Sequence, residues 1–158
     1  MLFTFETLGN ASNIAVQKYL NDRKIPQLFV AGRSTRFEDP INFPWTIGFA
    51  PNLRTEIRVY ARFILDNYPN ARIGLLYQND ESGKDYLIGL KEALGARAAE
   101  LIVSEASYDV SDPTVDSQVV RLKAAGVDVL INMAASKFAA QVIRKMAELD
   151  WKPVHLLG

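Results

Sequence analysis

The chain has 158 residues, of which 49% are hydrophobic, and this is enough for one ordinary domain or for parts of two. Its 18 basic and 18 acidic residues cancel, so no global field directs it toward nucleic acid or an anionic membrane. Cysteine is absent, which excludes disulfide frameworks, thiolate chemistry and metal centres held by cysteine.

The N-terminal part of the chain predicts one strand–helix–strand unit. Its opening stretch has no basic segment and soon reaches Glu6, so it predicts neither a signal peptide nor a membrane span. The predicted elements are a short buried strand at 2–5, a turn at 6–11, a helix at 12–20, a second strand at 27–31 and a polar loop at 32–35. Ser12 is the predicted N-cap of the helix, whose apolar positions include Val16 and Tyr19.

Residues 37–51 interrupt this regular pattern. Pro40, Pro44 and Pro51 divide the segment, which holds one short β-like piece at 45–49. We interpret it as the crossing between two lobes. The predicted division is therefore 1–46 as the C-terminal portion of a first lobe, with two strands and one helix, and 47–158 as a second lobe that is incomplete at its C-terminal end.

Strands and helices then alternate to the end of the chain. A long amphipathic helix is predicted at 53–68, followed by strands at 71–76, 101–103, 127–132 and 153–157 and by helices at 84–94, 115–124 and 135–149. Asp112 is the predicted cap of the helix at 115–124. Such alternation is typical of an α/β fold, a parallel sheet covered by helices.

Several catalytic chemistries are excluded by the residues present. A phosphate-binding loop at 78–85 would need glycine where Gln78 stands and a hydroxyl residue where Asp85 stands. The adjacent acids Asp80 and Glu81 are better suited to the N-terminus of a helix than to acid–base chemistry. The single histidine, His155, falls inside a predicted strand, so no catalytic triad, metal site or cofactor site is predicted.

Small, hydroxyl-bearing or amide residues follow four of the predicted strands. They lie at 9–12, 34–35, 79–83 and 132–136, each before a helix or turn. Free backbone amides and short hydroxyls at such positions can hydrogen-bond a small polar or anionic ligand, although each can also simply cap a helix. The four loops together favour a binding cleft at the carboxyl ends of the strands.

Four motifs of the chain resemble the branched-chain-amino-acid-type solute-binding proteins of ABC importers. The motifs are LGNASNIAVQKYLNDRKIPQLFVAG, PWTIGFAP, YQNDESGKDYLIGLKEALG and DPTVDSQVVRLKAAGVDVLI. The resemblance implies doubly wound parallel sheet lobes of the type I periplasmic binding fold, one lobe mostly present and the other a remnant. It also implies a periplasmic parent protein that binds a small solute and delivers it to an ABC permease.

The resemblance further implies which residues contact the ligand. By position these are Gly9, Asn10, Ala11, Ser12, Ser34, Thr35, Ser82, Ala134, Ala135 and Ser136. Two positions depart from the family's pattern: Arg33 stands where relatives commonly have glycine, and Ser82 replaces a residue that is often aromatic in amino-acid binders. Both departures weigh against an aliphatic amino acid as the ligand.

Three functions are compared on this basis. The first is the solute-binding component of an importer, and the alternative is a ligand-sensing domain of the same fold in a transcription regulator or receptor. The third, an enzyme on a flavodoxin-like fold, is disfavoured because no nucleophile–base pair can be assembled. The expected partners are a small-molecule ligand, a permease and, because two strands and one helix cannot cover a parallel sheet, a second copy of the chain.

Overall fold

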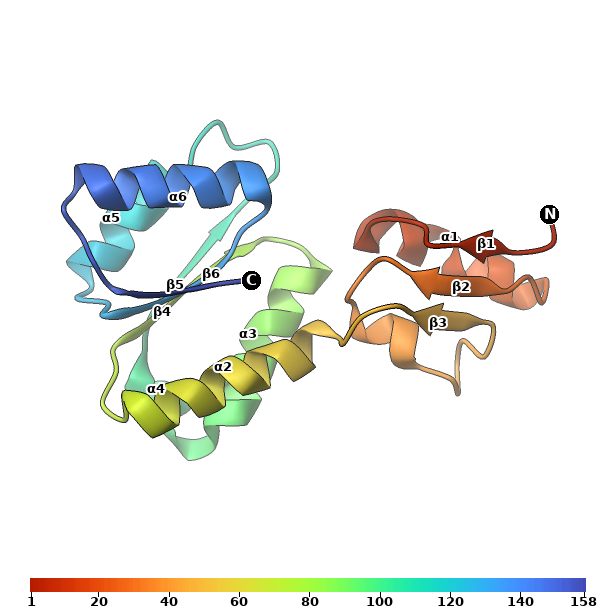
Figure 1. Ribbon diagram of the computed structural model, residues 1–158, viewed down its shortest axis with the longest axis horizontal. Coiled ribbons are helices and arrows are strands. Elements are labelled where there is room, and N and C mark those ends of the chain that lie inside the picture. The colour runs from red at the N-terminus through yellow and green to blue at the C-terminus, as the bar shows by residue number, and fades with distance from the viewer. The chain divides into compact units, whose positions relative to one another are not determined.

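The computed structural model describes all residues from 1 to 158, and the chain divides into two compact units, Met1–Glu56 and Ile57–Gly158 (Figure 1). Each unit has a parallel sheet of its own. The predicted α/β class is therefore confirmed. None of the helices has the length and apolar character that crossing a bilayer requires.

The N-terminal unit contains a three-stranded parallel sheet in the order β1-β2-β3. Its elements are β1 (Thr4–Phe5), α1 (Asn10–Asp22), β2 (Gln27–Val30), the 3-10 helix η1 (Thr35–Glu38) and β3 (Thr46–Gly48). The third strand is the short β-like piece predicted within the crossing segment, and it pairs with β2. The expectation of only two strands in this part of the chain is therefore wrong, and the compact unit extends past residue 46 to Glu56.

The contact between α1 and the sheet of the N-terminal unit is polar. Asn13 of α1 and Gln27 of β2 are both buried, and the Gln27 side-chain amide donates to Asn13 Oδ1 at 2.9 Å. Thr46 of β3 continues the chain of bonds by donating its hydroxyl proton to Gln27 Oε1 at 3.2 Å. Buried amides stay in a core only when such partners satisfy them, so this network fixes α1, β2 and β3 together.

The helix α1 buries a different face from the one its apolar residues predicted. Asn13, Gln17 and Leu20 are buried, whereas Val16 and Tyr19 are exposed. The prediction of Ser12 as N-cap is also wrong, because the cap position is Gly9 and the Ser12 hydroxyl donates to the Leu8 carbonyl at 3.1 Å. Satisfied polar contacts to the sheet thus override the apolar pattern of the helix.

The C-terminal unit contains a four-stranded parallel sheet in the order β5-β4-β6-β7. Its strands are β4 (Ile73–Gln78), β5 (Ile102–Tyr108), β6 (Val129–Met133) and β7 (Val154–Leu157). Its helices are α2 (Leu53–Asn67, which begins before the boundary), α3 (Glu81–Leu94), the 3-10 helix η2 (Gly95–Arg97), α4 (Ala98–Leu101), α5 (Asp116–Ala124) and α6 (Ser136–Glu148).

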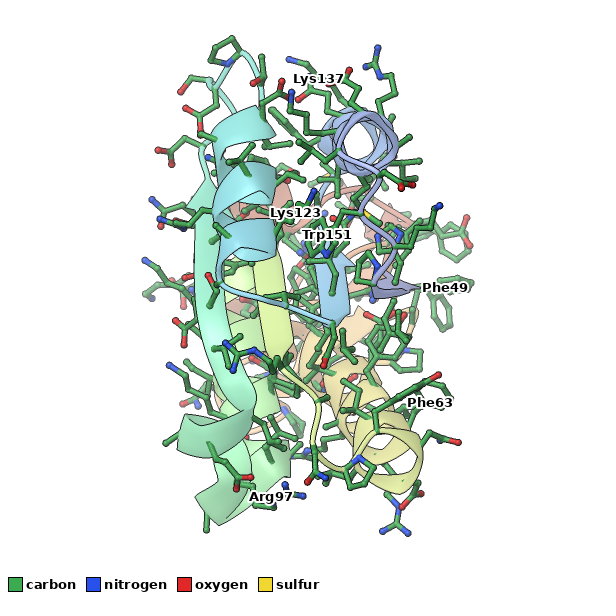
Figure 2. All side chains as sticks on the ribbon, turned by 90° about the vertical axis from the view of Figure 1, so that its left-hand side faces the viewer. Phe49, Phe63, Arg97, Lys123, Lys137 and Trp151 are labelled. Carbon is green, nitrogen blue, oxygen red and sulfur yellow. The ribbon has the colours of Figure 1, made fainter.

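Helices cover both faces of this second sheet, with α5 and α6 on one side and α2 and α3 on the other (Figures 1 and 2). Leu76 and Leu130 belong to the apolar cluster under α5 and α6, together with Phe138. Trp151, labelled in Figure 2, packs against this cluster and donates its indole N–H to the Val127 carbonyl at 3.2 Å. Alternate residues of the strands thus point to opposite helix layers, which makes this a doubly wound sheet.

Three predicted boundaries in this unit are corrected. The helix predicted from residue 84 begins at Glu81, and the strand predicted at 101–103 continues to Tyr108. Asp112 does not cap α5, because its carboxylate accepts a bond from the Asp109 amide at 2.9 Å and the helix begins only at Asp116. The short elements η2 and α4 were not predicted.

Candidate functional site

The carboxyl ends of β1 and β2 border a pocket of about 360 Å³ in the N-terminal unit. We call it the Arg33 pocket. Gly9 and Arg33 from the loops line it, together with Asn10 at the start of α1, Phe49 and Leu53 at the start of α2. Pockets of this size at the carboxyl ends of parallel strands are common ligand sites in α/β proteins.

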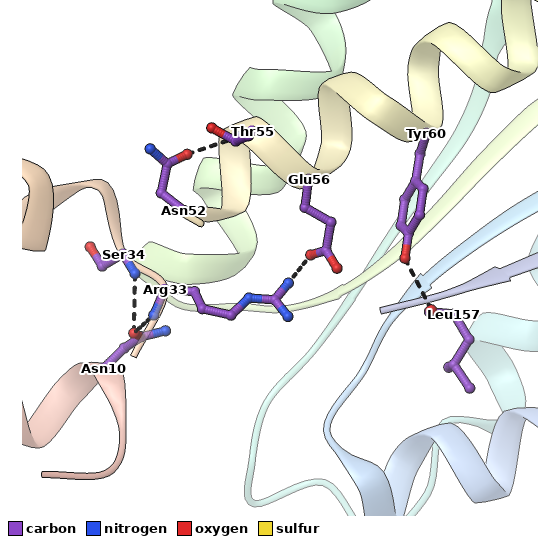
Figure 3. A network of polar contacts seen from close by, with 8 residues as sticks. All are labelled: Asn10, Arg33, Ser34, Asn52, Thr55, Glu56, Tyr60 and Leu157. Atoms are coloured by element: carbon purple, nitrogen blue, oxygen red, sulfur yellow. Dashed lines mark hydrogen bonds and ion pairs between the residues drawn. The ribbon is translucent and has the colours of Figure 1, made fainter. Parts of the chain in front are cut away.

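Asn10 connects the two loops that border the Arg33 pocket (Figure 3). Its Oδ1 accepts hydrogen bonds from the backbone amides of Arg33 at 2.8 Å and Ser34 at 3.2 Å. A Cβ at Gly32 would lie 2.6 Å from the same oxygen, so only glycine leaves room for this bridge. The predicted site residues Asn10 and Ser34 are therefore brought together, although Asn10 acts here on the loop itself.

The other predicted residues of the first lobe lie around this bridge. Ser34 is buried, and its hydroxyl accepts from the Arg36 amide at 3.3 Å, which caps η1. Thr35 is the first residue of η1, while Ala11 and Ser12 lie exposed in the first turn of α1. The structure thus assigns Ser34 a local capping contact and leaves Ala11 and Ser12 at the surface.

Arg33 forms an ion pair with Glu56, through its Nη2 and the Glu56 carboxylate (Figure 3). The Arg33 carbonyl also accepts from the Leu53 amide at 2.9 Å, so the loop after β2 is joined to the start of α2. Asn52 caps that helix by accepting from the Thr55 amide at 2.8 Å. These contacts hold the Arg33 side chain at the wall of the pocket.

In the C-terminal unit, the loop after β4 is closed by Asp80. Its Oδ1 accepts from the Gly83 amide at 2.8 Å and caps α3, as the sequence predicted for the acids of this turn. Its Oδ2 accepts from the Gln78 side-chain amide at 2.6 Å. A Cβ at Gly83 would overlap the Gln78 carbonyl oxygen, so glycine is required for α3 to approach the strand this closely. The predicted site residue Ser82 lies in this first turn.

Tyr108 connects the loops at the carboxyl ends of β4, β5 and β6. Its hydroxyl accepts from the Ala135 amide at 2.9 Å and donates to Gln78 Oε1 at 3.4 Å. Burial raises the pKa of this phenol above its usual value, so it stays protonated and able to donate at neutral pH. The predicted residues Ala134 and Ala135 therefore lie in an ordered turn, and Ser136 begins α6.

Tyr108 was missed because the strand at 101–103 was predicted too short. The sequence does carry a pattern for the longer strand, because polar Glu105 and Ser107 alternate with Ala106 and Tyr108. In the structure, Ala106 and Tyr108 are buried and Glu105 and Ser107 are exposed. An alternation of this kind is typical of a strand that faces a core on one side.

Replacing Tyr108 with phenylalanine is expected to remove the acceptor of the Ala135 amide and lower the free energy of unfolding by about 1 kcal/mol. The amide of Ala135 should then exchange faster with solvent. Tyr68→Phe is the matched control, because Tyr68 is partly exposed and its ring contact with Phe63 does not use the hydroxyl. Equal exchange of the Ala135 amide in both variants would contradict this account of the turn.

The loops at the carboxyl ends of both sheets carry hydrogen-bond donors and acceptors. No group of three or more histidine, aspartate or glutamate side chains is placed to share a metal ion. His155 lies in β7 as predicted, with its Nε2 3.2 Å from the Asn132 side-chain nitrogen, and burial lowers its pKa. The lowered pKa keeps this imidazole neutral at pH 7.

Comparisons with solved structures show the same fold in larger proteins. A substrate-binding periplasmic protein from Ralstonia solanacearum is 24% identical, with a TM-score of 0.85 over 99% of this chain and 43% of its own. An ABC transporter solute binding protein from Rhodopseudomonas palustris BisB5, solved with 3,4-dihydroxybenzoic acid, is 18% identical, with a TM-score of 0.77 over 98% of this chain and 41% of its own. A possible leucine/isoleucine/valine-binding protein from Rhodopirellula baltica SH 1 is 16% identical, with a TM-score of 0.84 over 99% of this chain and 43% of its own.

The chain thus spans about two fifths of the length of these structures, with 41–43% of each covered. No curated protein matches it in sequence. The sequence profile of the periplasmic binding protein family matches residues 3–158, which is nearly the whole chain. The parallel sheets, with ordered loops at their carboxyl ends, agree with this match. The chain therefore belongs to the periplasmic binding protein family.

Proposed function

We propose that this chain is part of a solute-binding protein that captures a small polar solute, of the amino acid or small organic acid type, in the periplasm and delivers it to an ABC permease. The observation that carries the proposal is that hydrogen bonds hold the loops at the carboxyl ends of both sheets in place. Asn10 bridges these loops in the N-terminal unit, and Tyr108 bridges them in the C-terminal unit. Preformed loops of this kind present backbone and side-chain polar groups without a large ordering cost. The function is binding without turnover.

The proposed ligand contacts are the residues predicted from the family's pattern. They are Gly9, Asn10, Ala11, Ser12, Ser34, Thr35, Ser82, Ala134, Ala135 and Ser136. Support comes from the position of Gly9 and Asn10 at the Arg33 pocket and of Ser82 and Ser136 in the first turns of α3 and α6. Backbone amides in a first helical turn are suited to polar and anionic groups.

The test is a set of single substitutions in a protein that supplies the whole family fold. Ser34→Ala, Thr35→Ala and Ser82→Ala are each expected to weaken solute binding by about 0.5–1.5 kcal/mol, the value of one hydrogen bond, and by more where the solute group is charged. Ser117→Ala is the control, because Ser117 lies on α5 and bonds only its neighbour Gln118. Calorimetry against a panel of amino acids and organic acids measures the effect, and unchanged affinity in all three variants would contradict the mapped contacts.

The chain of residues 1–158, taken alone, is expected to self-associate through its N-terminal unit. Phe5 and Phe29 of neighbouring strands stack edge to face, with centroids 5.7 Å apart, yet stay 54% and 41% exposed, and Ile47 of β3 is 49% exposed. A short parallel sheet with such an apolar surface and open edges tends to pair with another chain. Sedimentation should show a mass above that of the monomer, which Phe5→Asp lowers and Ile143→Asp, on α6, does not. A monomer at micromolar concentration, with residues 1–46 protected from protease, would refute this expectation.

A further inference from the structure

Asn132 is a buried amide near the carboxyl end of β6, and both of its polar groups have a partner. Its Oδ1 accepts from the Ala134 backbone amide at 3.2 Å, and its Nδ2 lies 3.2 Å from Nε2 of His155 on the neighbouring strand β7. A backbone N–H can only donate, so the oxygen of Asn132 must face Ala134 and the nitrogen must face the imidazole.

This contact fixes the protonation state of the His155 ring. Because the Asn132 nitrogen donates, Nε2 must offer a lone pair, and the ring proton of the neutral imidazole must lie on Nδ1. Burial lowers the pKa of His155 below its usual value of 6.5, so this neutral form is present at pH 7.

No charged side chain takes part in lowering the pKa of His155, because burial is its one cause. α2 reaches β7 through Tyr60, whose hydroxyl donates to the Leu157 carbonyl at 3.1 Å, and α6 covers the other side of the sheet. The titratable side chains of the segments that adjoin β7 are those of Tyr60, Asp128, Lys137, Arg144, Lys145, Glu148, Asp150 and Lys152. The charge state of the imidazole therefore acts directly on Asn132.

Protonation of His155 sets two donors against each other. Nε2 then carries a proton and faces the Asn132 N–H, and Asn132 can accept from the imidazolium only by turning its amide around. Its nitrogen would then face the Ala134 N–H. The bond to a charged donor is the stronger one, so the turned amide is favoured and the Ala134 amide loses its acceptor. Ala134 is 6% exposed, which leaves water little access to replace that bond.

From this arrangement we propose that His155 is a positioning residue for the solute, acting through Asn132. Its neutral form holds the loop at 134–136 in place, and its protonation frees the Ala134 amide and loosens the start of that loop. The role rests on the proposed solute-binding function, because Ala134, Ala135 and Ser136 are among the proposed ligand contacts. Solute affinity should therefore decrease as the pH falls through the pKa of His155.

A pH titration of the chain of residues 1–158 tests the loop without any solute. His155 is the single histidine, so its ¹⁵N-labelled ring gives one set of signals, which should show the Nδ1–H form at neutral pH. Between about pH 7.5 and about pH 5, the Ala134 amide resonance should move with the same midpoint as the ring. Its hydrogen exchange, divided by the intrinsic rate at each pH, should become roughly 10-fold faster.

The Val154 amide is the internal reference for this titration. It donates to the Asp128 carbonyl at 2.8 Å, an acceptor that does not titrate, so its corrected exchange should stay the same. A Nε2–H form at neutral pH, an Ala134 resonance that does not follow His155, or no titration of His155 before the chain unfolds would each overturn the role of His155.

Two substitutions change the switch in opposite ways. His155→Gln removes the titrating group, so the Ala134 amide should lose its pH response. Asn132→Asp supplies a carboxylate that can accept from both the imidazolium and the Ala134 amide, so the pKa of His155 should rise above 6.5. Asn67→Asp is the matched control, because it adds the same charge at an exposed position of α2 and should leave the midpoint of His155 unchanged.

Solute binding is then measured at both pH values in a protein that supplies the whole family fold. Calorimetry against a panel of amino acids and organic acids should show affinity roughly 5-fold or more weaker at the acidic pH, and His155→Gln should remove that difference. Equal affinity at both pH values would overturn the positioning role and leave solute binding standing. If no solute binds at either pH while Ala134 still follows His155, the proposed function fails and the coupling of His155 to the loop stands.

Discussion

Replacing Gly83 with alanine is expected to lower the free energy of unfolding of the C-terminal unit by about 3 kcal/mol, at the upper end of the usual cost of overpacking. An added Cβ would overlap the Gln78 carbonyl oxygen and lie 2.8 Å from the Tyr77 ring. Backbone cannot move aside as a flexible side chain can, so α3 must shift away from β4. Chemical denaturation followed by circular dichroism measures the loss.

The control for this variant lies one residue earlier. Ser82→Ala leaves the approach of α3 to β4 unchanged, and it is expected to cost less than about 1 kcal/mol. The cap bond from the Gly83 amide to Asp80, 2.8 Å long, should persist in the control and be lost in Gly83→Ala. Equal stability of the two variants would mean that the close approach at Gly83 does not position the first turn of α3.

Replacing Asn13 with alanine is expected to destabilise the N-terminal unit by roughly 2–4 kcal/mol, because several buried partners lose bonds at about 1–3 kcal/mol each. The Asn13 side-chain amide donates to the carbonyls of Thr7 at 2.9 Å and Gly9 at 2.6 Å, and its Oδ1 accepts from Gln27. These bonds hold the loop after β1, which carries Gly9 and Asn10. Thermal denaturation measures the stability.

Amide exchange distinguishes a local effect on this loop from a general loss of stability. In Asn13→Ala, the amides of Gly9 and Ala31 should exchange faster than in the parent chain, and their increase should exceed that of the β4 amides. The Ala31 amide is affected because it donates to the Thr7 carbonyl. The matched control is Asn67→Ala, since Asn67 is exposed at the end of α2 and should change stability by no more than about 0.5 kcal/mol. Unchanged exchange at Gly9 in Asn13→Ala would show that the loop is held by other contacts.

The sequence predicted the fold class because its strongest signals are local and periodic. β4 and β6 are continuous buried runs of strand length. The helices α2 and α6 are long enough for their amphipathic period to be recognised. The face of α1 was not predictable in this way. Its burial depends on Asn13 and Gln17 finding partners on other segments, and hydrophobic pattern carries no information about such pairs.

The candidate site was predicted in its loops but not in its contacts. Gly9 and Asn10 were expected at the end of a strand, and they line the Arg33 pocket. Tyr108 was missed because the strand at 101–103 was predicted too short, whereas Phe49 was missed because it reaches the Arg33 pocket only through folding of segments distant in the chain. The pairing of Arg33 with Glu56 was missed for the same reason, since the two residues are far apart in sequence.

A small solute should bind at the carboxyl ends of the strands. Hydrogen–deuterium exchange of a protein that supplies the whole family fold, with and without each member of a panel of amino acids and organic acids, tests this directly. With at least one solute, exchange should slow at 7–12, 32–36, 79–83 and 134–136 and stay unchanged at the amino-end segments 24–27 and 126–129. Protection only at those amino-end segments, or no protection with any solute, would contradict it.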